Sequence, residues 1–164
     1  MNELERVLVA DGAAAAPEAI VGALPDAAAH KRIDGVPRTI YEELWHVAFW
    51  LQISLDWVSG IETPYPEHAA AGFPTKDDIL TESWEELIRR FLRMLVEAGD
   101  AACDMSRLDL LVRCPSPPGR HVRTMTIREQ LENLAAHNAY HLGRIVLMRQ
   151  MLGLWPPPDG GFTW

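Results

Sequence analysis

Residues 134–143 read LAAHNAYHLG and place two histidines, His137 and His141, four positions apart in a segment with the apolar spacing of a helix. Residues four apart lie on the same face of an α-helix, displaced by about 6 Å along its axis. A buried imidazole there needs a hydrogen-bond partner or a ligand that it shares with other side chains. The pair therefore predicts either core histidines with hydrogen-bond partners or two ligands of a metal site.

This stretch lies in the last of four helical segments that the sequence predicts. Thr126 and Glu129 form a capping-box pattern at its start, and Gly153 is placed to end it. The positions of its seam are Ile127, Leu131, Leu134, Asn138, His141, Ile145, Met148 and Leu152. The polar interruption falls in the middle of an otherwise apolar seam, so the candidate site lies halfway along this helix.

The other three helical segments are marked by their start and stop signals. A helical arm with a break at Gly12 covers residues 2–24 and includes the short piece AAAAPEAIVGAL. The second segment covers residues 39–60, and its apolar residues surround the helix axis, which is typical of a central helix. The third covers about residues 81–100 and is amphipathic.

The connections between these segments are long. Residues 61–80 contain three prolines and a glycine and are predicted to form an irregular loop, of the kind that is often functional. Residues 104–125 hold two short extended runs around PSPPGR, which predict a small β-hairpin before the last helix. The expected fold is all-α, a four-helix bundle with long connecting loops, in a single domain over residues 1–164.

Composition excludes several classes of partner. Lysine and arginine total 15 against 23 aspartates and glutamates, a formal charge of -8, which disfavours nucleic acid. The start of the chain lacks the pattern of a signal peptide, and no apolar run is long enough for a membrane helix. Cys103 and Cys114 have neither disulfide-framework nor metal-site spacing and are expected to be free thiols. We expect a cytoplasmic protein.

His46, in the second segment, is a third candidate ligand. It shares a stripe with Trp50 and Trp57 and therefore points into packing. Three imidazoles from two helices can hold a divalent cation and leave coordination positions open for water or substrate, as catalytic sites do. The alternative for each is a core histidine satisfied by a carbonyl or carboxylate. A metalloprotease is disfavoured, because Asn138 follows His137 where HExxH needs glutamate.

Two segments carry a resemblance to a known family. Residues 137–157, HNAYHLGRIVLMRQMLGLWPP, together with residues 39–52, TIYEELWHVAFWLQ, resemble the DinB-like (YfiT-like) superfamily of metal-dependent enzymes. The resemblance implies a four-helix bundle whose three histidines bind a divalent metal, commonly nickel or zinc. The family's first histidine falls on His46, and its paired histidines fall on His137 and His141.

Family members with known activity resemble transferases or isomerases that use a low-molecular-weight thiol such as bacillithiol or mycothiol. The resemblance therefore implies a metal-dependent transferase that activates such a thiol toward a small-molecule substrate. A metal-dependent hydrolase that activates water is the second interpretation. A third is a non-catalytic stress protein that holds a metal ion or a small ligand.

Three carboxylates are candidates to orient the metal ligands. Glu42 and Glu43 lie about one turn before His46, and Glu132 lies on the last helix. Metal-bound histidines need such acceptors at their second ring nitrogen. The simpler interpretation of each carboxylate is a surface charge.

Loop residues and the chain end carry further expectations. His68 and His121 are expected in solvated loops, although a loop over the mouth of the bundle would bring His121 near the site. Arg120 and Arg123 flank it and are candidates to meet an anionic thiol cofactor. The tryptophan-rich second segment and the ending GGFTW are compatible with a homodimer.

Overall fold

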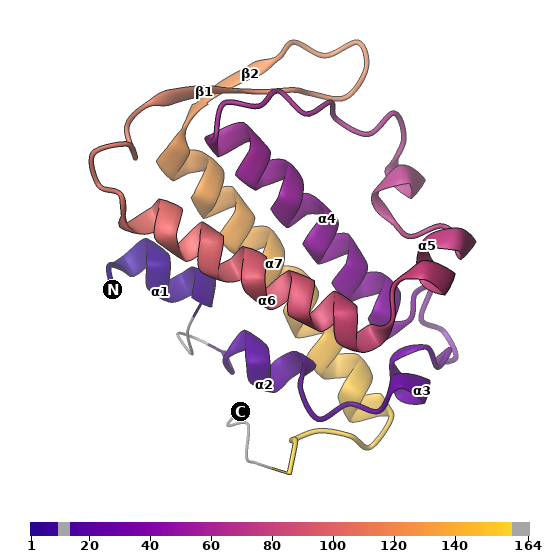
Figure 1. Cartoon of the computed structure of the whole chain (residues 1–164). Helices are drawn as coiled ribbons and strands as arrows, with labels where there is room; N and C mark the ends of the chain where they lie inside the picture. Colours follow the sequence, from indigo (N-terminus) through magenta and orange to yellow (C-terminus); the bar gives the residue numbers. More distant parts are fainter. Residues whose placement is uncertain (10–13, 159–164) are drawn as a thin grey trace.

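The computed structural model describes residues 1–9 and 14–158 of the chain. It is a helical bundle with a small antiparallel sheet at one end (Figure 1). The elements in chain order are α1 (Glu3–Val9), α2 (Pro17–Val21), α3 (Asp26–Ala29), α4 (Ile40–Val58), the 3-10 helix η1 (Ala69–Gly72), α5 (Lys76–Thr81), α6 (Trp84–Cys103), β1 (Leu111–Cys114), β2 (Arg123–Thr126) and α7 (Ile127–Met151). The predicted helical class and the hairpin are confirmed, whereas the first predicted segment is divided into shorter helices.

The helix α4 is central and packs against both α6 and α7 (Figure 1). It begins with a capping box, in which the Thr39 hydroxyl accepts from the Glu42 N–H and the Glu42 carboxylate accepts from the Thr39 N–H. These reciprocal bonds satisfy donors that the first helical turn leaves without partners. Leu44 and Val47, which lie one turn apart, are fully buried. His46 is therefore carried by a well-anchored element.

The helix α6 is amphipathic and packs against α1 as well as α4 (Figure 1). Ser83 and Glu86 form the capping box at its start. The helix therefore begins three residues later than predicted, because residues up to Thr81 belong to α5. It also runs three residues beyond the predicted end, to Cys103.

The sequence predicted an irregular loop over residues 61–80, but the structure shows short helices within this segment. It contains η1 and α5, and α5 begins with a capping box formed by Thr75 and Asp78. The 3-10 helix η1 packs against α4 and brings Gly72 to within van der Waals contact of the His46 ring. This segment thus supplies one wall of the candidate site.

The hairpin before α7 has the predicted position. In its antiparallel ladder Leu111 lies opposite Thr126, and Cys114 lies opposite Arg123. A second apolar cluster, formed by Ile53, Trp57 and Cys114, ties the hairpin to the end of α4. The hairpin therefore lies across the C-terminal end of α4 and the N-terminal end of α7 (Figure 1).

One of three further predictions agrees with the described structure, and the other two concern residues outside it. None of the described helices is both long and apolar enough to cross a lipid bilayer. The predicted break of the first segment at Gly12 lies outside the described residues. The ending GGFTW, on which the expected self-association partly depends, also lies outside them.

Candidate metal centre

The three predicted histidines lie together between α4 and α7. His46 comes from the first half of α4, and His137 and His141 come from successive turns of α7. One ring nitrogen from each histidine lies within 4.8 Å of the other two. The Nε2 atoms of His46 and His137 are 3.3 Å apart. The structure thus brings all three candidate ligands to a common centre.

The ring of His46 is held by the segment that precedes α5. Its Nδ1 lies 2.7 Å from the carbonyl oxygen of Gly72. Because a carbonyl can only accept, Nδ1 carries the proton and donates it. Phe73 stacks on the imidazole with ring centroids 4.2 Å apart, and the Arg38 guanidinium lies 4.1 Å from the Phe73 centroid. The Nε2 atom of neutral His46 therefore presents a lone pair to the cluster.

The ring of His141 is held by Glu43, which lies one turn before His46 on α4. The Nδ1 atom of His141 donates to Oε2 of Glu43 at 2.7 Å, and Arg144 donates to Oε1 at 2.8 Å. Burial opposes ionisation of Glu43, but the hydrogen bonds from His141 and Arg144 outweigh it, so the pKa of this carboxyl lies below its ordinary value. Glu43 is only 1% exposed, so its interpretation as a surface charge was wrong.

His137 completes the cluster from the α7 side. Burial, reinforced by the neighbouring His141 and His46, lowers the pKa of His137 to about 4. Burial likewise lowers the pKa of His46. Both rings are therefore neutral near pH 7. Among the described residues, the buried Nδ1 of His137 has no hydrogen-bond partner.

This donor set fits a divalent cation. The Nε2 atoms of His46 and His141 face the same centre, and a neutral His137 can offer a proton to only one of them. Two nitrogens bound at about 2.0–2.1 Å to one tetrahedral zinc lie roughly 3.3–3.4 Å apart. The separation of the His46 and His137 Nε2 atoms, 3.3 Å, matches that spacing. Neutral imidazole suits zinc and nickel alike.

The comparison with known families agrees with this geometry. A family model described as the DinB superfamily matches residues 11–145. The chain belongs to the DinB superfamily. The matched range contains all three histidines of the cluster, and the resemblance that the sequence predicted is confirmed at the level of the family. No curated protein matches the chain.

A cavity of about 450 Å³ adjoins the cluster in this DinB-superfamily protein. His46 and His137 form part of its wall. Its other side chains are mainly aromatic or polar: Trp50, Trp57, Tyr65, Phe73, Ser54, His68, Arg123, Gln130 and Asn133. Cavities of this size bind small molecules. The cluster is therefore accessible to a small ligand from this side.

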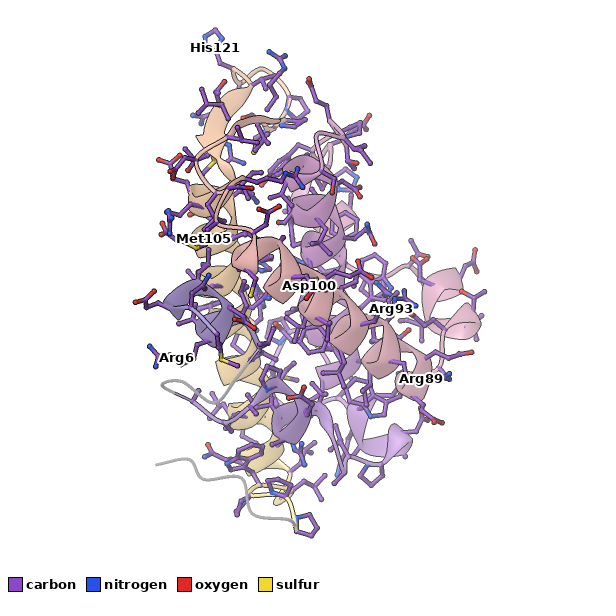
Figure 2. The ribbon with its side chains drawn as sticks, turned by 60° about the vertical axis from the view of Figure 1, so that its left-hand side comes forward. Arg6, Arg89, Arg93, Asp100, Met105 and His121 are labelled. Atoms are coloured by element: carbon purple, nitrogen blue, oxygen red, sulfur yellow. The ribbon has the colours of Figure 1, made fainter. Side chains whose placement is uncertain are left out.

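Three other candidates of the DinB-superfamily protein, Glu42, Glu132 and His121, belong neither to the cluster nor to the cavity lining. Glu42 caps α4 through the Thr39 N–H and accepts a hydrogen bond from Arg32 at 2.9 Å. Glu132 is exposed on α7. His121 is exposed at the tip of the hairpin and points away from the bundle (Figure 2), so its predicted solvated position is confirmed and the alternative, in which a loop brings it to the site, does not hold.

Sequence reasoning missed the contribution of Gly72. A Cβ atom at this position would lie 3.4 Å from both Nδ1 of His46 and Nε1 of Trp50. A Cβ would only just fit against both rings, so a larger side chain at this position would crowd the contact between the carbonyl and the histidine. The contact joins residues 26 positions apart, so no local pattern in the sequence could have indicated it.

Proposed function

We propose that this protein binds a divalent cation, nickel or zinc, at His46, His137 and His141 and acts as a transferase that uses a low-molecular-weight thiol. The main support for the metal site is the orientation of the imidazole rings of His46 and His141. Gly72 and Glu43 engage the Nδ1 atoms of His46 and His141, which leaves both Nε2 atoms directed to the centre. Outer hydrogen bonds of this kind fix the orientation and basicity of histidine ligands.

The cavity supports the catalytic part of the proposal. A divalent cation held by three histidines supplies Lewis acidity, which lowers the pKa of a thiol or water. The chain's own residues bind the reactants beside it, since His46 and His137 form part of the cavity wall. Trp50 and Trp57 make part of this wall apolar, and no described lining residue is a carboxylate that would repel a thiolate.

Metal analysis of the purified protein tests the site itself. We expect one divalent ion per chain in the wild type and a loss of stoichiometric metal in His46→Ala, His137→Ala and His141→Ala. His121→Ala is the matched control, because its side chain is exposed at the hairpin tip. Circular dichroism verifies that each variant is folded. A folded wild type that takes up neither zinc nor nickel would refute the site.

Thiol dependence of turnover tests the reaction class. In the reaction of 1-chloro-2,4-dinitrobenzene with a small thiol, a carbon–sulfur bond forms, chloride leaves and the thiol proton passes to solvent. We expect turnover only when both the metal and the thiol are present. Hydrolysis of an activated ester without thiol would instead select the hydrolase. If the metal-loaded protein turns over neither substrate, the non-catalytic interpretation holds.

A further inference from the structure

The cavity beside the histidines is elongated along α4 and α7. Its lining residues on α4 extend from His46 to Trp57, eleven residues or about 16 Å of helix. On α7 they extend from His137 back to Gln130, seven residues or about 10 Å. One end is formed by the histidines, and we call the other, where Arg123 lies, the hairpin end.

The charge of the cavity differs from that of the whole chain. The chain has a formal charge of -8, yet none of the described residues that line the cavity is an aspartate or glutamate. Arg123 is the one arginine or lysine among these lining residues. An anionic ligand therefore meets attraction and no local repulsion at the hairpin end, whereas a cationic ligand finds no counter-charge.

Arg123 is positioned by the hairpin and is not neutralised within it. It is the first residue of β2, opposite Cys114, and its guanidinium lies 5.8 Å from the Trp57 ring centroid. Its neighbour on β1, Arg113, is paired with Glu62 at 2.8 Å. The ion pairs in the described part of the chain involve other arginines than Arg123. Its donors are available for a carboxylate in bidentate geometry.

A fixed polar pair lies toward the hairpin end of the cavity. Gln130 donates from Nε2 to the Ser54 hydroxyl at 3.0 Å and accepts from the Cys114 thiol at 3.6 Å. Gln130 and Ser54 are both buried. Because these bonds fix the amide, its second N–H is left to donate to a ligand. Trp50 and Trp57 supply flat apolar faces on the same wall.

We infer that the cavity takes an elongated ligand with a flat apolar body and a carboxylate at the end remote from the histidines, where the carboxylate pairs with Arg123. The inference rests on the proposed function only for the reactive end of the ligand, which would lie at the histidines. A single guanidinium without a second cation matches a monoanion rather than a phosphate dianion. The two ends of the cavity set a ligand length of roughly 10–16 Å.

Isothermal titration with 6-phenylhexanoate and with its primary amide tests the inference. We expect the wild type to bind the carboxylate roughly three- to fivefold more tightly than the amide, because Arg123 is exposed and solvent weakens its ion pair. Arg123→Gln should remove this preference, because it weakens binding of the carboxylate more than binding of the amide. Arg120→Gln, which changes the net charge equally in the same hairpin turn but lies outside the cavity lining, should retain it.

The titrations are made on zinc-loaded and on metal-free protein, with zinc content measured separately. A preference that survives in Arg123→Gln and disappears without zinc places the carboxylate at the histidines and overturns the inference. Equal affinity for the two probes, or no binding of either, also overturns it. Failure of zinc binding refutes the proposed metal site instead, while the preference due to Arg123 remains measurable in the metal-free protein.

Discussion

The Nδ1 atom of His141 lies 2.7 Å from Oε2 of Glu43, across the interface between the two helices that carry the histidine cluster. Arg144 occupies the second oxygen of the same carboxylate at 2.8 Å. Glu43 is buried, so both bonds form away from bulk solvent, where charge-assisted hydrogen bonds are strong. The pair couples the position of a candidate metal ligand to the packing of α4 against α7.

Replacement of Glu43 should weaken metal binding without removing a ligand. We expect Glu43→Gln to lower the affinity for zinc by roughly 10- to 100-fold, because the acceptor that orients His141 loses its charge. Competition with a chromophoric chelator measures this affinity. Glu132→Gln, an exposed change on α7, is the control and should bind as the wild type does. An unchanged affinity in Glu43→Gln would show that the carboxylate has no orienting role.

Enlargement of Gly72 should act on His46 from the other side. In Gly72→Val the added Cβ lies 3.4 Å from His46 Nδ1 and Trp50 Nε1, and its methyl groups reach further. The carbonyl at position 72 must then move away from His46, and we expect zinc affinity to fall by roughly tenfold. Ala70→Val, in the same 3-10 helix but exposed, is the matched control. Equal affinities in the two variants would contradict this role.

The sequence was informative where a pattern is local. The capping boxes at Thr39 and Thr126 gave the starts of α4 and α7. The apolar seam of α7 interrupted by Asn138 and His141 marked the level of the candidate site, and both residues are buried. The three histidines meet in the structure, while their role as metal ligands stays a prediction.

The outer contacts of the histidines could not be predicted in the same way. A glutamate in the first turn of a helix is ordinarily favoured by the helix dipole and solvated, and Glu43 has that position. Its burial depends on Arg144 and His141, which lie about 100 residues later in the chain. The support of His46 by Gly72 likewise depends on the path of a segment whose short helices carry little periodicity.

The two cysteines should differ sharply in reactivity. The pKa of both thiols is raised, that of Cys103 by its hydrogen bond with Glu5 and that of Cys114 by burial, but Cys103 is exposed whereas Cys114 is fully buried. We expect one thiol per chain to react rapidly with Ellman's reagent in the native protein and two in denaturant. The Cys103→Ser variant should show no rapid reaction. Rapid labelling of Cys114 in that variant would show that the hairpin opens readily.

Alkaline pH should reduce the stability of the fold through Tyr41. This side chain is fully buried and donates to the Glu82 carbonyl at 2.8 Å, and burial raises its pKa to about 12. The unfolded chain ionises near pH 10, so the free energy of unfolding decreases as pH rises from about 10 to 12, by about 2 kcal/mol. Chemical denaturation at several pH values measures the slope. Tyr41→Phe should lose this component of the slope, and an identical slope in both proteins would contradict it.

Removal of Arg149 should destabilise the protein although no carboxylate pairs with it in the described structure. Arg149 is fully buried in α7 and donates from Nη1 to the carbonyls of Ile20 and Gly22 and from Nε to that of Leu154. Arg149→Met keeps much of the volume but leaves these carbonyls without a donor, so we expect a loss of about 2–4 kcal/mol. Urea denaturation measures it. Arg89→Met, at an exposed position on α6 (Figure 2), should change stability by less than about 0.5 kcal/mol. Equal stabilities of the two variants would mean that water replaces the guanidinium at these carbonyls.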